Sequence, residues 1–153
     1  MIGKSWLQAI IVKKLNIVKK LNTKVYNYTL KECKRTHHNC HLCKYDNYGD
    51  GICLCTVLYK SIKEITSVVK SVKKREQITI YGEYKRIVIN KLKYFIRLTH
   101  AILGYMSKEC LRRDFDCSEC KFDDYGNKCP CTDINNSIHE VTEVLHMIEE
   151  NKL

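Results

Sequence analysis

Residues Cys33–Cys55 read CKRTHHNCHLCKYDNYGDGICLC, and the same pattern of cysteines returns at Cys110–Cys131, CLRRDFDCSECKFDDYGNKCPC. The spacing is C-x6-C-x2-C-x9-C-x-C in the first copy and C-x6-C-x2-C-x8-C-x-C in the second. All 10 cysteines of the 153-residue chain belong to one copy or the other. We call the two stretches the first and the second cysteine module.

Each module has the spacing of a structural zinc site. A C-x2-C pair lets two thiolates bind one ion from a tight turn, and a second close pair completes a tetrahedron. The pattern therefore predicts two structural zinc ions, one in each module. Because zinc binds four ligands, one cysteine of each module is left over, and the spacing leaves open whether it is the first or the last. The candidate ligands are Cys33, Cys40, Cys43, Cys53, Cys55, Cys110, Cys117, Cys120, Cys129 and Cys131.

Disulfides, iron–sulfur clusters and thioredoxin-like redox chemistry are alternative uses of these cysteines. Each module has five cysteines, an odd number that cannot close into disulfides by itself. A redox C-x2-C pair requires a strand-to-helix turn in a βαβ unit, and the sequence shows no such alternation. The amino terminus, MIGKSWLQAIIVKK, lacks the cleavage site of a signal peptide. We therefore expect a reduced, cytoplasmic, zinc-binding chain.

Three histidines lie among the cysteines of the first module, where they resemble metal ligands. The second module has no histidine at the matching positions, so two modules that bind metal in the same way do not need them. The matching pairs are His37 and Asp114, His38 and Phe115, and His41 and Ser118. We expect the histidines to be exposed loop residues.

Apolar residues recur at helical spacing on both sides of each module, which predicts amphipathic helices. Residues 5–32 carry Ile11, Leu15, Val18, Leu21, Val25 and Tyr28, and an offset of 77 gives Val88, Leu92, Phe95, Leu98, Ile102 and Tyr105. After the first module come Leu58, Ile62, Ile65, Val69 and Val72, and an offset of 76 gives Ile134, Ile138, Val141, Leu145 and Ile148. Thr56 and Thr132, directly after the last cysteine of each module, are expected to cap the helices that follow.

The sequence therefore predicts an all-α fold made of two helix–module–helix units. A single helical hairpin cannot bury both of its apolar stripes, so the two units are expected to pack as one four-helix bundle. We expect residues 1–75 to form the first unit and residues 87–153 the second, within one compact domain. Residues 76–86 form the connector, although an early start to the third helix is the alternative for part of this stretch.

The net charge of +10 is unevenly distributed between the units. Residues 1–76 contain 16 basic and 5 acidic side chains, whereas residues 77–153 contain 11 and 12. The predicted basic face of the first unit consists of Lys13, Lys20, Lys24, Lys31, Lys60, Lys63, Lys70 and Lys74. The second unit has Asn90, Arg97, Ala101, Lys108, Asn136, His139, His146 and Glu150 at these positions. The units therefore share a core pattern but differ in surface charge.

This basic face predicts contact with the phosphates of nucleic acid by a small regulatory protein. The alternative is an acidic protein surface, bound by an inhibitor or adaptor of the kind that phage-like mobile elements direct against host enzymes. A lysine-rich surface produced by an AT-rich genome is the alternative without function. No phosphate loop, nucleophile elbow or paired-carboxylate motif is present, so we expect neither an enzyme nor a small-molecule substrate. No apolar run has the length of a transmembrane helix.

Overall fold

The computed structural model describes residues 2–35, 53–73, 83–112, 125 and 129–150. These residues form α1 (Ile2–Arg35), α2 (Leu54–Lys73), α4 (Glu83–Arg112) and α5 (Pro130–Glu150). The described part of the chain is therefore all-helical, as predicted. Helix α1 is longer than the predicted range of 5–32, and α4 begins at Glu83, inside the range expected for the connector.

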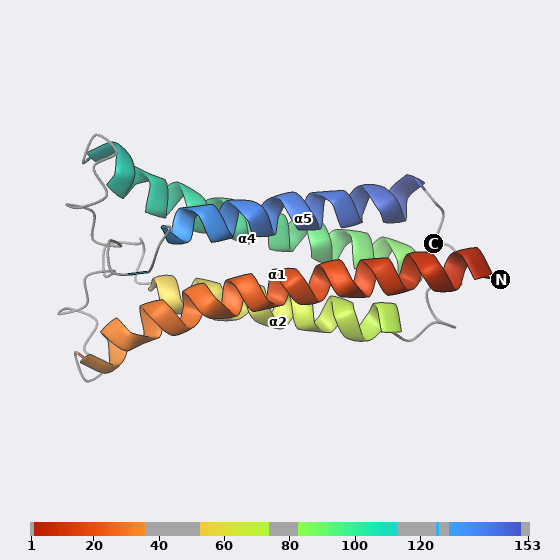
Figure 1. Cartoon of the computed structure of the whole chain (residues 1–153), viewed down its shortest axis with the longest axis horizontal. Coiled ribbons are helices and arrows are strands. Elements are labelled where there is room, and N and C mark those ends of the chain that lie inside the picture. Colours follow the sequence, from red (N-terminus) through yellow and green to blue (C-terminus); the bar gives the residue numbers. More distant parts are fainter. Residues whose placement is uncertain (1, 36–52, 74–82, 113–124, 126–128, 151–153) are drawn as a thin grey trace.

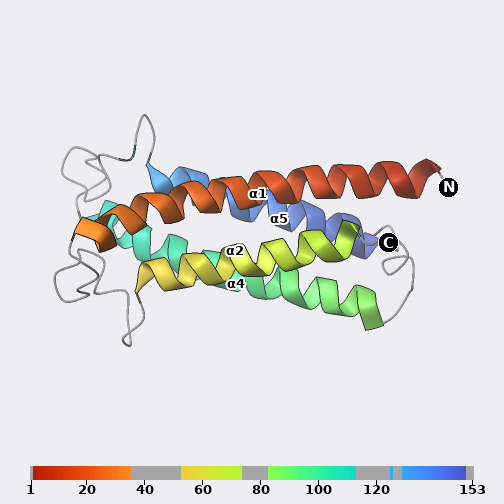
Figure 2. The same cartoon turned by 90° about the horizontal axis from the view of Figure 1, so that it is seen from below.

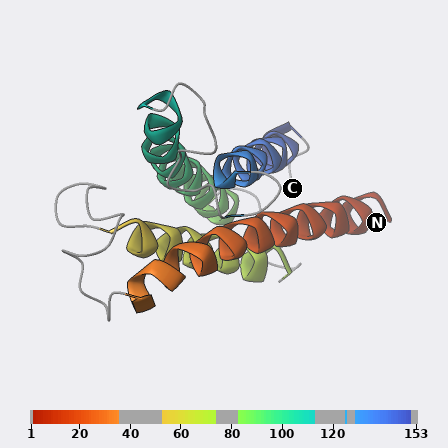
Figure 3. The same ribbon diagram turned by 60° about the vertical axis from the view of Figure 1, so that its left-hand side comes forward.

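The helices form an antiparallel four-helix bundle (Figure 1). Each of α1 and α4 packs against both α2 and α5. Helix α1 and α2 form one antiparallel pair, which lies against the pair of α4 and α5 (Figure 3). Helices α1 and α4 both end, and α2 and α5 both begin, at the same end of the bundle (Figures 1 and 2). The helix ends that border the two cysteine modules are therefore brought together.

The core consists of successive layers to which every helix contributes one buried residue. Buried positions alternate steps of four and three residues, which keeps them on one face of each helix. They are Ile11, Leu15, Val18, Asn22, Val25 and Thr29 on α1, and Val88, Leu92, Phe95, Thr99, Ile102 and Met106 on α4. On α2 they are Leu54, Leu58, Ser61, Ile65, Val68 and Val72, and on α5 Pro130, Ile134, Ser137, Val141, Val144 and Ile148. Matching positions keep the offsets of 77 and 76 found in the sequence.

The prediction of the stripe on α1 was wrong at two positions. Leu21 and Tyr28 are only partly buried, whereas the polar neighbours Asn22 and Thr29 are completely buried. The physical reason is that the buried positions of α1 continue to alternate steps of four and three residues after Val18. This spacing leads to Asn22 and Thr29, although their side chains are polar. The same correction applies to Leu98 and Tyr105 on α4, whose neighbours Thr99 and Met106 are buried. On α2, Ile62 is partly buried, and Val68 was missed.

A polar layer crosses the middle of the core. It consists of one fully buried polar side chain from each helix, namely Asn22, Ser61, Thr99 and Ser137. The amide nitrogen of Asn22 donates a hydrogen bond of 3.0 Å to Ser61 Oγ, and Thr99 Oγ1 donates one of 2.6 Å to the Phe95 carbonyl. Apolar clusters lie on both sides of this layer, one from Ile11 to Val18 and one around Val25. The layer therefore divides the core into two apolar halves.

Candidate functional site

The cysteines that the structure describes lie at the helix ends that border the modules. Cys33 is in the last turn of α1, Cys53 directly precedes α2, and Cys55 is in its first turn. In the second unit the corresponding positions are Cys110 in the last turn of α4, Cys129 directly before α5 and Cys131 in its first turn. The remaining predicted ligands Cys40, Cys43, Cys117 and Cys120 lie outside the described residues, as do His37, His38 and His41.

Among the described side chains, no three histidine, cysteine, aspartate or glutamate residues form a group that could hold a metal ion. Four of the predicted ligands lie outside those residues, namely both C-x2-C pairs. The metal sites therefore stay a prediction from the sequence. The structure does show the surroundings of the thiols that lie at the helix ends.

The helix caps differ from those predicted. Because α2 begins at Leu54 and α5 at Pro130, Thr56 and Thr132 lie inside the first turns rather than before them. The cap residues are Cys53 and Cys129, whose carbonyls each accept a 3.1 Å hydrogen bond from the backbone N–H of Thr56 or Thr132. The threonine hydroxyls approach the cysteine sulfurs to 3.1 Å in the first unit and 3.5 Å in the second. The cysteines therefore take the position usually held by serine or aspartate.

This cap position favours the thiolate form of Cys129. Burial alone would raise the pKa of Cys129, but hydrogen bonds from the side chain and backbone of Thr132 and from Cys131 outweigh burial, so the pKa is lowered. A thiol at a helix N-terminus is stabilised as the thiolate by the helix dipole as well. The thiolate is the form that binds zinc. Cys129 is therefore chemically suited to be a ligand.

Cys55 has a different environment from Cys53, although one residue separates them. Cys55 is 8% exposed, and its thiol donates a 3.3 Å hydrogen bond to Thr29 Oγ1 on α1. Tyr26 lies close to both cysteines and to Cys33: burial raises the pKa of Tyr26, and the charges of Cys55, Tyr59, Cys33 and Cys53 raise it further. Cys131, at the matching position of the second unit, packs against the apolar cluster around Val25. The last cysteine of each module therefore faces the core.

A polar cluster connects Tyr125, a residue of the second module, with α1 and α5. Tyr125 donates a hydrogen bond of 2.6 Å to Asp133 Oδ2, and the Lys24 ammonium lies 3.4 Å from the same oxygen. Lys24 also lies 4.8 Å from the centroid of the Tyr125 ring. The centroids of the Tyr125 and Tyr28 rings are 5.0 Å apart, and the two rings are nearly perpendicular. Burial and the hydrogen bond to Asp133 raise the pKa of Tyr125. Sequence reasoning missed this cluster, because Asp133 corresponds to Val57 and the repeat gives no sign of it.

The predicted basic face is exposed to solvent. Seven of its eight members have exposed side chains, and the eighth, Lys74, lies outside the described residues. Lys24 is paired with Asp133, whereas no ion pair holds Lys13, Lys20, Lys31, Lys60 or Lys70 within the described part of the chain.

Two lysines of α1 lie at the same levels of the bundle as two lysines of α2. The hydrogen bond between Asn22 and Ser61 fixes the register of these antiparallel helices. Lys20 lies two residues before Asn22 on α1, and Lys63 lies two residues after Ser61 on α2. Lys13 and Lys70 lie nine residues before and after the same two residues. The two lysines of each pair, one on α1 and one on α2, therefore lie at the same level of the bundle.

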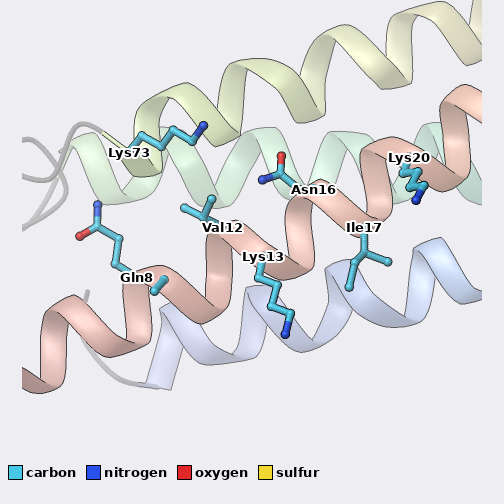
Figure 4. Close-up of a pocket in the computed structure, with 8 residues that line it drawn as sticks. Gln8, Val12, Lys13, Asn16, Ile17, Lys20 and Lys73 are labelled. Carbon is cyan, nitrogen blue, oxygen red and sulfur yellow. The ribbon is translucent and has the colours of Figure 1, made fainter.

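Two open hollows lie along α1. The larger measures about 700 Å³ and is lined by Gln8, Ala9, Val12, Lys13, Asn16, Ile17 and Lys20 from α1 and by Lys73 from α2 (Figure 4). The smaller measures about 500 Å³ and is lined by Asn16, Lys19, Lys20, Thr23, Lys24 and Asn27. Asn16 and Lys20 belong to both hollows, so the two are continuous along α1.

The two helices of the second unit carry opposite charges, although the net charge of the unit is close to zero. Helix α4 carries seven basic and two acidic side chains, whereas α5 carries five acidic and no basic ones. Helix α5 uses this charge against α1, where Lys14 lies 3.1 Å from Glu140 and 2.8 Å from Glu143. The hydrogen bonds to Glu143 and Glu140 raise the pKa of Lys14, and the bond to Lys14 lowers that of Glu143. A charge count for each predicted helix, instead of one for each half of the chain, would have indicated this contact between α1 and α5.

None of the described helices is long and apolar enough to cross a membrane. No known protein family, curated protein sequence or solved structure matches this chain. The candidate functions therefore depend on the residues themselves.

Proposed function

We propose that this chain is a small, internally duplicated, zinc-stabilised protein that binds nucleic acid through the outer side of α1 and α2. The observation that carries the proposal is a set of exposed lysines at matching levels of α1 and α2, namely Lys13 and Lys70, and Lys20 and Lys63. Ammonium groups held at such a surface attract phosphates and displace their counterions, which is the main source of affinity in protein–nucleic acid binding.

The side chains between the lysines suit the same ligand. Asn16, Thr23 and Asn27 line the hollows that the lysines border. Amides and hydroxyls of this kind bind phosphate and sugar oxygens, which positions a nucleic acid without reading its sequence. We therefore propose binding with little base specificity.

Zinc is proposed to tie the helix ends of each unit and to supply folding free energy to the bundle. The contacts of the described cysteines favour one of the two ligand sets. The Cys55 thiol donates a hydrogen bond to Thr29, which requires its proton, whereas Cys53 lies at the helix cap. We propose that Cys33, Cys40, Cys43 and Cys53 bind one ion, and that Cys110, Cys117, Cys120 and Cys129 bind the other.

An acidic protein segment is the second candidate partner, for an inhibitor or adaptor role in the cytoplasm. The larger hollow favours it, because its lining includes the apolar residues Ala9, Val12 and Ile17 as well as Lys13, Lys20 and Lys73. An amphipathic acidic helix would match such a surface. It would bind stoichiometrically, and nuclease treatment would not release it.

The proposal is tested by fluorescence anisotropy with labelled oligonucleotides over a range of salt concentrations. If six lysines contact phosphates, the logarithm of the binding constant should fall with the logarithm of salt at a slope of roughly −4 to −5. The variant K13Q/K20Q/K63Q should reduce this slope by roughly 2 to 3. The matched control K93Q/R97Q/K108Q removes equal charge from exposed positions of α4. Equal losses in both variants would show binding by net charge alone and overturn the proposed site.

A further inference from the structure

We propose that Asn22 and Ser61 are positioning residues for the first metal site. Their hydrogen bond selects the one register of α1 and α2 in which both helix ends reach the same ion. This inference rests on the proposed zinc binding and deepens it. Asn22 lies 11 residues before Cys33, and Ser61 lies 8 residues after Cys53. At about 1.5 Å per residue they are about 12 to 17 Å from these cysteines, so they act on the metal site only through the helices.

The apolar layers of the core do not by themselves select a register. Outside the polar layer, the buried core positions of α1 and α2 are isoleucine, leucine or valine, with Thr29 as the exception. They are Ile11, Leu15, Val18 and Val25 on α1, and Leu54, Leu58, Ile65, Val68 and Val72 on α2. A slide of α2 by seven residues along α1 keeps the buried stripes facing each other. It again opposes aliphatic side chains, which replace one another in a core at small cost.

The side chain of Asn22 does distinguish the registers. Its amide nitrogen donates a 3.0 Å hydrogen bond to Ser61 Oγ, and both side chains are completely buried. After a slide of seven residues in either direction, Asn22 would face Leu54 or Val68, and its nitrogen would lose this acceptor. The loss of a buried hydrogen bond disfavours each slipped register roughly 5- to 150-fold.

Asn22 selects this register at a cost in stability. Its Oδ1 is buried without a hydrogen-bond partner among the described residues, and a buried acceptor in that state is unfavourable. A single buried asparagine that lowers stability while it fixes register is a known device of helical assemblies. The benefit of the residue is therefore the alignment of the helices.

The proposed zinc ligands depend on this alignment. A slide of seven residues displaces the ends of the two helices by about 10 Å. Zinc holds its thiolates at about 2.3 Å, so Cys33 in the last turn of α1 and Cys53 directly before α2 could not share an ion after such a slide. In the observed register both cysteines lie near Tyr26. The register is therefore a requirement of the first metal site.

The second unit provides an internal control. Thr99 and Ser137 match Asn22 and Ser61, but Thr99 Oγ1 donates its hydrogen bond to the Phe95 carbonyl of its own helix. That bond is made in any register of α4 against α5. Thr99→Val should therefore weaken neither metal site.

The test is competition for zinc between the full chain and a chelator, with the ions on each chain counted by native mass spectrometry. Asn22→Leu is expected to be more stable, so a merely structural role predicts that both ions are held more tightly. Positioning predicts the opposite for one ion. Two slipped registers then compete with the observed one, which leaves roughly one third of the chains able to bind the first ion and weakens that site roughly 3-fold.

Two further variants separate the hydrogen bond from the volume of the side chain. Ser61→Ala removes the acceptor and should weaken the first site as Asn22→Leu does. Asn22→Ser combined with Ser61→Asn keeps one amide and one hydroxyl in the layer and should restore zinc binding. Circular dichroism of each variant establishes that the helices are intact.

The register itself is measured by double electron–electron resonance. Spin labels are attached to non-natural side chains at the exposed Ala9 of α1 and Lys60 of α2, so that the thiols stay free. Before and after addition of the chelator, the unsubstituted chain should give one distance. Asn22→Leu should give additional distances, displaced by about 10 Å, after the chelator is added.

The possible failures are distinguishable. Undiminished zinc affinity and a single distance in Asn22→Leu would overturn the inference and leave the proposed zinc sites standing. Equal weakening of both sites by Asn22→Leu, or weakening by Thr99→Val, would indicate a general loss of packing and overturn it as well. An unsubstituted chain that binds no zinc would overturn the proposed metal sites, and the positioning role with them.

Discussion

Tyr125 donates a hydrogen bond of 2.6 Å to the completely buried carboxylate of Asp133, joining the second cysteine module to the first turn of α5. Lys24 approaches the same carboxylate from α1, so one acidic side chain links the second unit to the first. A buried carboxylate is costly unless it is hydrogen-bonded and paired. The contact between the units is therefore sensitive to the loss of a single hydroxyl group.

Tyr125→Phe should destabilise the chain by about 1 to 3 kcal/mol, because it removes a donor from a buried charged group. The free energy of unfolding measured in urea checks this expectation. Tyr94→Phe is the matched control, since Tyr94 is partly exposed on α4, and it should change stability by no more than about 0.5 kcal/mol. Equal stability of the two variants would show that the bond to Asp133 contributes nothing.

Asn22→Leu should stabilise the chain by about 1 to 3 kcal/mol. Asn22 Oδ1 is buried without a hydrogen-bond partner among the described residues, and a buried acceptor in that state costs about this much. Leucine has a similar volume and would join the two apolar halves of the core. Thermal and urea unfolding measure the change, with the exposed Asn16→Leu as control. A destabilised Asn22→Leu variant would indicate that a bound water or another group satisfies the amide oxygen.

The proposed metal sites predict two zinc ions per reduced chain, measured by native mass spectrometry of protein purified without added metal. Cys53→Ser should lose one ion, because it removes a proposed ligand, whereas Cys55→Ser should retain both. Cys40→Ser and Cys117→Ser should each lose one ion and much of their helicity, because zinc contributes folding free energy. Loss of zinc from Cys55→Ser with retention in Cys53→Ser would reverse the assignment. Bound iron and sulfide, or five disulfides without metal, would refute zinc binding.

Acid should weaken the seam between α1 and α5. The bond to Lys14 lowers the pKa of Glu143 below its ordinary value of 4.5, so the stabilisation is complete above pH 4.5 and is lost as the pH falls through the lowered pKa. The pKa of Lys14 is raised above 10.5, so on the alkaline side the stabilisation is complete below pH 10.5 and is lost as the pH rises through that raised pKa. Glu143→Gln should flatten the acid side of the stability profile. The exposed Glu149→Gln, outside the seam, should leave that profile unchanged.

Much of the bundle could be predicted because its signals are local and occur twice. The apolar stripes of α2 and α5 and the exposed lysines of α1 follow from helical spacing alone. The errors have physical causes. An apolar Leu21 was preferred to the polar Asn22, although continuous spacing buries Asn22 and a hydrogen bond to Ser61 makes that burial possible. Cysteine is not one of the residues that usually cap helices, so the sequence predicts Thr56 as the cap of a helix that in fact begins at Leu54.

The contacts between the units could not be predicted by comparing the two repeats. Lys24, Tyr125 and Asp133 come from different units, and their matching positions do not form the same set. A comparison of repeats finds what the units share, whereas these residues are where the units differ. The role of the acidic side chains of α5 could not be predicted for the same reason, because it depends on the position of Lys14 of α1 beside Glu140 and Glu143.

The ion pairs of Lys14 also favour pairing of the first helical hairpin with the second. Because the two units share the spacing of their core layers, the first unit of one molecule could in principle take the place of the second unit of another, as in domain swapping. Glu140 and Glu143 correspond to Glu64 and Ser67 of the first unit, so two first units would keep one of these pairs and bring their like charges together. The acidic side chains of α5 therefore favour closure within one chain over exchange between molecules.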